Sequence, residues 1–164
     1  MSSTGTNLLS DHARLEIDRW LKRYPQQQRR SGVMQALMIV QEENGGSLNE
    51  TLMDAVADYL EMPQIAVREV ATFYSMYNLK PVGRHVVNVC TNISCMLRGA
   101  EKVVARMEKK LGIRVGETTA DGRITLREAE CLAACAGAPA CQIGRRYHEN
   151  LTAEKADALL DGLE

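Results

Sequence analysis

The chain has 164 residues, of which 45% are apolar, 25% are charged and 4% are aromatic, and its formal net charge is −1. Interspersed charges and few aromatic side chains provide no basic face and no base-stacking platform, so the composition argues against nucleic-acid binding. No apolar run approaches the roughly 20 residues that span a bilayer, and the first residues lack the features of a secretion signal. We therefore expect a cytoplasmic protein with reduced cysteines.

The first half of the sequence predicts a small helical bundle. Ser10 can cap a first helix that ends before Pro25, and a polar connector over 26–30 leads to a second helix. A third helix starts near Asn49, and Pro63 suits the first position of a fourth. The apolar residues recur at the spacing of amphipathic helices: Ile17, Trp20, Leu21 and Tyr24, then Val33, Met34, Leu37, Met38 and Val40, then Leu52, Val56, Tyr59 and Leu60, and finally Val67, Val70, Ala71 and Tyr74.

The segment Lys80-Pro81-Val82-Gly83 breaks the helical pattern. We predict a domain boundary there, with the helical bundle over 1–80 and a second domain over 81–164. The second domain shows these elements in order: a strand over 85–89, a helix marked by Leu97, Ala100, Val104, Met107 and Leu111 and closed by Gly112, strands over 124–126 and 140–143, and a last helix capped by Thr152. The predicted fold class is therefore α+β or α/β, with helices layered on a small sheet.

Four of the five cysteines form two close pairs. Cys90 and Cys95 have four residues between them, and Cys131 and Cys135 have three. Each pair follows a predicted strand, where a loop can offer both thiolates and free backbone N–H groups. Thiolates are soft ligands, and two such pairs can meet around one metal centre. Because N–H groups that donate to sulfur hold the negative charge of an iron–sulfur site, the residues favour such a site.

Other interpretations stay open on spacing alone. A structural zinc site usually has tighter pairs but tolerates wider gaps. A dithiol oxidoreductase would use a two-residue spacing, and four free buried thiols would need no metal. A Rieske-type centre needs two histidine ligands, and His12, His85 and His148 do not stand beside cysteines at a suitable spacing. The fifth cysteine, Cys141, follows Pro139 in an apolar context, so we expect a small buried residue.

Four longer motifs stand out in the sequence: Val70-Ala71-Thr72-Phe73-Tyr74-Ser75-Met76-Tyr77, the segment 89–99 around the first cysteine pair, Glu130-Cys131-Leu132-Ala133-Ala134-Cys135, and Tyr147-His148-Glu149-Asn150-Leu151-Thr152. Together they resemble a known family, the small iron–sulfur subunit of NADH:quinone oxidoreductase (the E-type, or 24-kDa-type, subunit of bacterial complex I). The resemblance implies an N-terminal helical bundle followed by a thioredoxin-like [2Fe-2S] ferredoxin domain. It also implies that Cys90, Cys95, Cys131 and Cys135 hold one [2Fe-2S] cluster.

The resemblance further implies an electron-transfer subunit of an NADH dehydrogenase that is not catalytic alone. The resemblance implies that FMN and NADH bind to a partner flavoprotein of the F type, and this chain has no G-x-G-x-x-G fingerprint of its own. A further iron–sulfur subunit of the peripheral arm is the other expected partner, and the complex would hold the chain at the cytoplasmic face of the inner membrane. One alternative is the equivalent diaphorase subunit of an NAD-reducing hydrogenase or NAD-dependent formate dehydrogenase. The second is a zinc-stabilised protein-interaction module.

Two positions depart from the family's pattern. Many relatives have glycine where this chain has Ala133, and a hydrophobic residue such as methionine or valine near Cys141. Neither departure touches the four paired cysteines. We expect Cys141 not to be a ligand, because Cys131 and Cys135 already form the natural pair.

Overall fold

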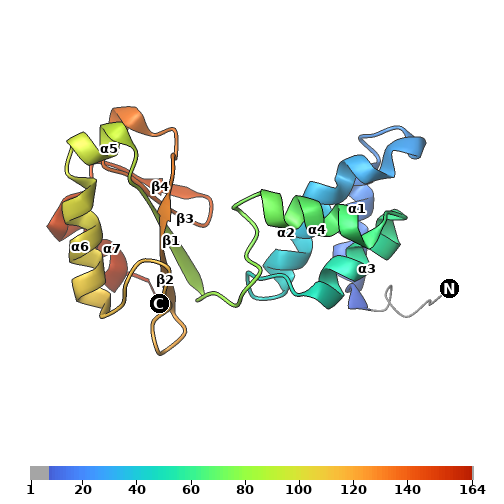
Figure 1. Cartoon of the computed structure of the whole chain (residues 1–164), viewed down its shortest axis with the longest axis horizontal. Coiled ribbons are helices and arrows are strands. Elements are labelled where there is room, and N and C mark those ends of the chain that lie inside the picture. Colours follow the sequence, from blue (N-terminus) through green and yellow to red (C-terminus); the bar gives the residue numbers. More distant parts are fainter. Residues whose placement is uncertain (1–7, 164) are drawn as a thin grey trace. The chain divides into compact units, whose positions relative to one another are not determined.

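The computed structural model describes residues 8–163. The chain divides into two compact units, Met1–Pro81 and Val82–Glu164 (Figure 1). Each unit has its own hydrophobic core. The first unit is helical, and the second contains a four-stranded sheet. The α+β class predicted from the sequence is therefore confirmed. Within residues 8–163, none of the helices is both long and apolar enough to cross a bilayer.

The first unit is built from amphipathic helices with side-chain caps. Ser10 and Asn49 start α1 and α3 as predicted, since their side chains accept the N–H groups of Ala13 and Leu52. The apolar stripes of the helices meet in one core that includes Leu37. The elements are α1 (Asp11–Leu21), the 3₁₀ helix η2 (Gln26–Gly32), α2 (Val33–Glu43), α3 (Glu50–Leu60) and α4 (Gln64–Phe73).

Three details of this unit differ from the sequence prediction. The connector over 26–30 belongs to the 3₁₀ helix η2, because a short polar run can satisfy its own backbone groups with i+3 bonds. Pro63 is the N-cap of α4, because its ψ of 135° is extended. Tyr74 lies beyond the end of α4 and is 40% exposed, so helical spacing does not bury it. Its ring packs edge-on against the exposed Phe73, with 5.1 Å between centroids.

A pair of buried amides fixes the segment that follows α4. Gln41 Nε2 donates to the carbonyl of Met76 (3.1 Å), and its Oε1 accepts the N–H of Asn78 (2.6 Å). Asn78 Nδ2 donates to the carbonyl of Gly46 (2.7 Å), and the Asn78 carbonyl accepts the N–H of Leu48 (2.7 Å). This network therefore ties the segment after α4 to α2 and to the loop between α2 and α3.

Replacing Gln41 with leucine should destabilise the first unit by about 1–3 kcal/mol, because the N–H of Asn78 loses its acceptor inside the fold. Trp20 is the only tryptophan of the chain and lies on α1, so its fluorescence during urea unfolding measures the loss. Gln35→Leu on the same helix is the matched control and should cost about 0.5 kcal/mol or less. Equal unfolding midpoints for the two variants would contradict a stabilising network.

The second unit is a mixed sheet covered on one face by two helices. The strand order is β2-β1-β3-β4, with β1 parallel to β2 and antiparallel to β3. α6 and α7 lie side by side over the sheet (Figure 1), joined by an ion pair between Arg106 and Asp157. The elements are β1 (His85–Cys90), α5 (Ile93–Leu97), α6 (Ala100–Leu111), β2 (Ile124–Ala129), the 3₁₀ helix η3 (Cys135–Gly137), β3 (Cys141–Ile143), β4 (Arg146–His148) and α7 (Ala153–Asp161).

The prediction for this unit is right for the end of α6 and the start of α7, and wrong for the start of α6. Gly112 ends α6 and Thr152 caps α7, as expected. The helix predicted from Leu97 onward instead starts at Ala100, because Gly99 has a left-handed φ of 92° and separates it from α5. Leu97 is consequently 76% exposed. Strand β4 was not predicted, since it is a short edge strand of largely exposed polar residues.

Candidate metal centre

The sheet topology brings the two cysteine pairs to the same edge of the sheet. Cys90 is the last residue of β1, and it pairs in parallel register with Ala129, the last residue of β2. The loop after β1 then carries Cys95, and the loop after β2 carries Cys131 and Cys135. The sequence predicted that each pair follows a strand. The structure adds that these two strands are parallel neighbours, so both loops start from one edge.

The first cysteine pair is buried. Cys90 and Cys95 are both shielded from solvent, and their thiols are hydrogen-bonded to each other. Cys95 lies on the short helix α5, whose N-cap is Asn92; the Asn92 Oδ1 accepts the N–H of Ile93 (2.8 Å). Leu132 from the other loop belongs to the same buried cluster as the two thiols. Sequence analysis did not single out Asn92, although asparagine ahead of a helix is a cap signal.

The second cysteine pair is exposed. Cys131 and Cys135 both reach solvent, and the N–H of Ala133 donates to Cys131 Sγ (3.3 Å). The pKa of Cys95 is raised first by burial and by its hydrogen bond to Cys90, and to a smaller extent by an electrostatic interaction with Cys135 of the second pair. The site therefore has a buried side and a side that a partner can approach.

Backbone N–H groups are aimed at the sulfur atoms of the first pair. Burial by itself raises the pKa of Cys90, but the N–H groups of Asn92 and Leu132 and the Cys95 thiol bring it below its ordinary value. For Cys95, burial is the largest cause of a raised pKa, and the N–H of Ala140 opposes it. N–H groups that donate to sulfur favour the thiolate, which is the form that binds metal.

This set of donors fits an iron–sulfur cluster. Among residues 8–163, no three cysteine, histidine, aspartate or glutamate side chains are grouped as ligands of a single metal ion. A [2Fe-2S] cluster has a different requirement, because each iron takes only two protein sulfurs and bridging sulfides complete its coordination. Two thiol pairs on neighbouring loops, with N–H groups on their sulfurs, provide that arrangement.

Cys141 is set apart from the paired cysteines. It lies on β3 opposite Val89 of β1 and is fully buried in the core between the sheet and its helices. Neighbouring residues of a strand point to opposite faces, so Val89 and Cys141 face away from the cluster of buried residues around Cys90. Burial raises the pKa of Cys141 to about 12. The expectation of a small buried residue is confirmed.

Ala133 has a strained backbone conformation that glycine would adopt without strain. Its φ is 55°, in the left-handed region, which costs a residue with a Cβ roughly 1 kcal/mol. Ala133→Gly should therefore raise the free energy of unfolding of the second unit by about 0.5–1 kcal/mol. Ala134→Gly is the control, because Ala134 has a φ of −104° and glycine should lower stability there. Urea unfolding followed by far-UV circular dichroism measures both, and the opposite ranking would contradict the strain.

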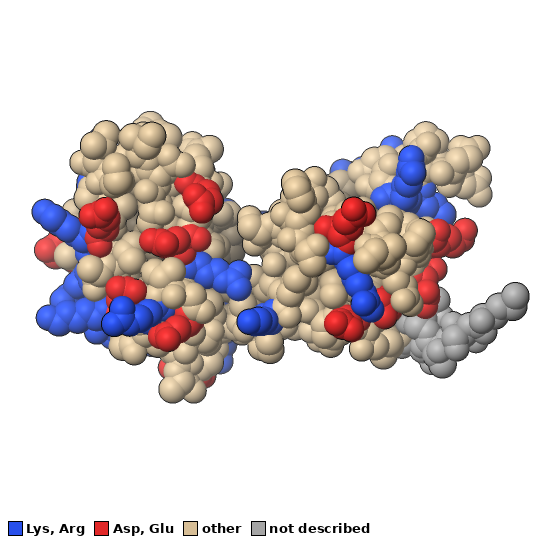
Figure 2. Space-filling view, in the orientation of Figure 1, with Lys and Arg blue, Asp and Glu red and all other residues tan. Residues whose placement is uncertain are grey.

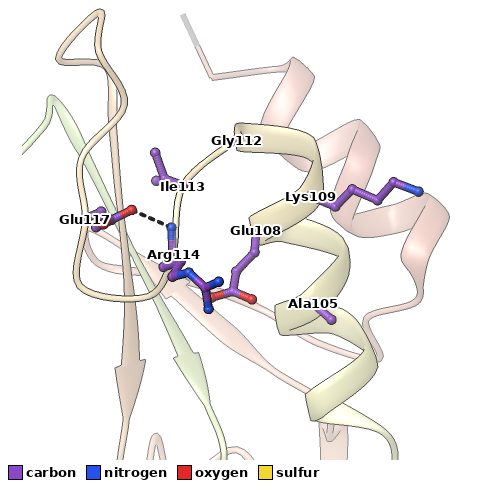
Figure 3. A pocket seen from close by; sticks show the side chains of 7 residues that line it. All are labelled: Ala105, Glu108, Lys109, Gly112, Ile113, Arg114 and Glu117. Atoms are coloured by element: carbon purple, nitrogen blue, oxygen red, sulfur yellow. Dashed lines mark hydrogen bonds between the residues drawn. The ribbon is translucent and has the colours of Figure 1, made fainter.

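An open hollow lies at the other end of α6 (Figure 3). Its carboxylates serve the loop that follows the helix: Glu117 accepts the N–H of Arg114 (2.7 Å), and Glu108 accepts the N–H of Val115 (3.0 Å). These side chains therefore fasten a loop, and we assign the candidate site to the cysteine edge of the sheet.

The family described as thioredoxin-like [2Fe-2S] ferredoxin matches residues 17–164. Two crystal structures of an NAD+-reducing [NiFe]-hydrogenase share the fold. The air-oxidised state gives a TM-score of 0.67 at 20% identity, and the H2-reduced state gives 0.64 at 21%. Each likeness covers 77% of this chain but only 22% of the hydrogenase chain. Fold and site thus define a thioredoxin-like [2Fe-2S] ferredoxin, a class that carries the one [2Fe-2S] cluster expected from the sequence.

Closer relatives identify the branch of that class. The chain is 45% identical to the E-type subunit of NADH-quinone oxidoreductase from Rickettsia felis, over 95% of this chain and 94% of the relative. It is 42% identical to the E-type subunit from Rickettsia conorii, over 100% and 99%, and 47% identical to the second E-type subunit from Rhizobium meliloti, over 90% and 86%. The chain belongs to the family of E-type subunits of NADH-quinone oxidoreductase, so the resemblance noted in the sequence is confirmed.

Proposed function

We propose that Cys90, Cys95, Cys131 and Cys135 hold one [2Fe-2S] cluster, and that the chain carries single electrons within an NADH:quinone oxidoreductase (complex I). The supporting observation is the parallel pairing of β1 with β2, from whose ends both cysteine loops start. When bound, the cluster supplies one-electron oxidation and reduction. The chain itself aims N–H groups at sulfur and covers the inner thiol pair with Leu132.

The proposed partner is a flavoprotein of the F type that binds FMN and NADH, with a further iron–sulfur subunit of the peripheral arm nearby. Ile93, Met96 and Leu97 of α5 expose apolar side chains next to the first cysteine loop. On the face shown in Figure 2, the end of the unit that carries α5 has few charged side chains. An apolar surface with few charges beside exposed thiols suits a partner that must approach closely. Through this assembly the chain would lie at the cytoplasmic face of the inner membrane.

The cofactor assignment is tested on the isolated chain. Two iron atoms and two acid-labile sulfides per chain are expected, with a brown colour that dithionite bleaches and a paramagnetic signal after reduction. The isolated chain should not oxidise NADH, because it lacks a flavin-binding partner. Stoichiometric zinc without sulfide would contradict the cluster and support a zinc-stabilised interaction module.

A second candidate assembly is an NAD-reducing hydrogenase or an NAD-dependent formate dehydrogenase. The fold likeness to a hydrogenase chain favours this candidate, whereas 42–47% identity to the E-type subunits favours the quinone oxidoreductase. Purification of the tagged chain from its own cells separates the two. A flavoprotein with membrane-embedded proton-pumping subunits supports the first assembly, and a hydrogenase or molybdenum subunit in their place supports the second.

A further inference from the structure

One side chain joins the two cysteine loops. The Nδ2 of Asn92 donates to the carbonyl of Glu130 at 2.6 Å. Asn92 lies between Cys90 and Cys95, and Glu130 comes directly before Cys131. The hydrogen bond therefore crosses from one loop to the other at the point where the second cysteine pair begins.

The other end of the same carboxamide is also engaged. The side-chain Oδ1 of Asn92 accepts the N–H of Ile93 (2.8 Å). The backbone carbonyl of Asn92 accepts the N–H of Met96 (2.8 Å), as in the first turn of a helix. Because both ends of the carboxamide are bonded, its orientation is fixed. One end starts the helix that carries Cys95, and the other holds the backbone in front of Cys131.

The Asn92 bond continues the pairing of the two strands beyond their ends. The last bond between the strand extensions, from the N–H of Thr91 to the carbonyl of Ala129, is long at 3.3 Å. Further along the second loop, the N–H of Leu132 crosses back to donate to Cys90 Sγ. The short Asn92–Glu130 bond lies between these two contacts, so it holds the loop spacing on which the bond from Leu132 to sulfur depends.

We propose that Asn92 is a positioning residue that fixes the separation of the two cysteine loops and so keeps the N–H of Leu132 aimed at Cys90 Sγ. For its effect on the cofactor, the proposal rests on the proposed function, in which the cysteines are the cluster ligands. Without the Asn92–Glu130 bond, the loops separate more readily and a hydrogen bond to sulfur weakens. Such bonds stabilise the more negative, reduced state, so their loss lowers the reduction potential.

Asn92→Ser separates the loop contact from the helix cap. Serine caps helices about as well as asparagine, but its shorter side chain has no second polar atom to reach the carbonyl of Glu130 while it caps. Asn92→Ala removes both functions. In both variants of the cluster-loaded chain we expect the visible absorbance to fall about fivefold faster in the presence of EDTA, and a more negative midpoint potential. Asn49→Ser makes the same change at the N-cap of α3 in the other unit and should alter neither quantity.

Hydrogen exchange in the metal-free chain tests the role of Asn92 without depending on which residues bind the cluster. In the metal-free chain, the amide hydrogen of Leu132 should exchange with solvent faster in Asn92→Ser than in the unchanged protein. If Asn92→Ser matches the unchanged protein in exchange, chelation rate and potential, Asn92 is only a helix cap and the proposal is wrong. A chain that binds no iron or sulfide before any substitution contradicts the proposed function, and the exchange of Leu132 still decides the role of Asn92.

Discussion

Replacing Cys95 with alanine should reduce the iron and sulfide content of the purified chain more than about tenfold, since we propose Cys95 as a ligand and the loss of a ligand exceeds the effect of losing a supporting contact. Cys95 is buried, is hydrogen-bonded to Cys90 and interacts electrostatically with Cys135 of the other loop, so it connects the two cysteine pairs. Metal analysis, sulfide analysis and visible absorbance per chain measure the loss. Cys131→Ala and Cys135→Ala should give the same result from the second loop.

The chain provides its own matched control for this experiment. Cys141 is as deeply buried as the inner thiol pair but faces the other core, so Cys141→Ala should keep the full iron content and an unchanged spectrum. It should cost about 1 kcal/mol of stability through the small cavity left behind. Loss of the cluster in Cys141→Ala would make Cys141 a ligand and contradict the assignment, as would a full cluster in Cys95→Ala.

The second large effect is expected at Gly83, where alanine should destabilise the second unit by about 2–4 kcal/mol. A Cβ at this position would lie 2.9 Å from the backbone N and C atoms of Ile124. These atoms belong to β2 and cannot rotate away as a side chain can. The N–H of Gly83 also donates to the buried Oγ1 of Thr125 (2.6 Å), so a shift that relieved the clash would lengthen this bond.

Gly162→Ala is the control for the added methyl group. A Cβ there meets its nearest atom at 3.5 Å and the residue has a φ of −81°, so the change should stay within about 0.5 kcal/mol. During urea unfolding, the loss of cluster absorbance gives the midpoint of the second unit, while the fluorescence of Trp20 reports on the first. A midpoint for Gly83→Ala as high as that for Gly162→Ala would show that β2 can move aside.

Local signals in the sequence were sufficient for most helix ends and for the candidate site residues. Ser10 and Thr152 were predicted as caps and Asn49 as the approximate start of a helix, and each of the three side chains accepts the N–H of a residue three positions ahead. A cap depends on a few consecutive residues, so a single sequence contains all the information it needs. The two cysteine pairs were also visible locally, because each pair lies on one short loop after a strand.

Contacts between distant residues could not be predicted in the same way. The Gln41–Asn78 and Asn92–Glu130 bonds join residues 37 and 38 positions apart, and nothing in the composition of either partner points to the other. The parallel pairing of β1 with β2 has the same origin, since strand order depends on how the whole unit packs. Leu97 fits the helical spacing, but the left-handed Gly99 interrupts the helix and leaves that side chain in solvent.

The direction of β2 limits how short this polypeptide could become. Two antiparallel strands can be joined by a tight turn, but parallel strands need a crossover of a dozen or more residues, and α5 and α6 form it here. Removing α6 would leave enough chain to reach the starting side of the sheet, but it would remove the buried side chains of Val103, Val104 and Met107 that pack this connection against the sheet. A helix that contributes no thiol thus supports the parallel pairing of β1 and β2, which brings both cysteine loops to one edge of the sheet, so a deletion within α6 should also disturb the proposed cluster site.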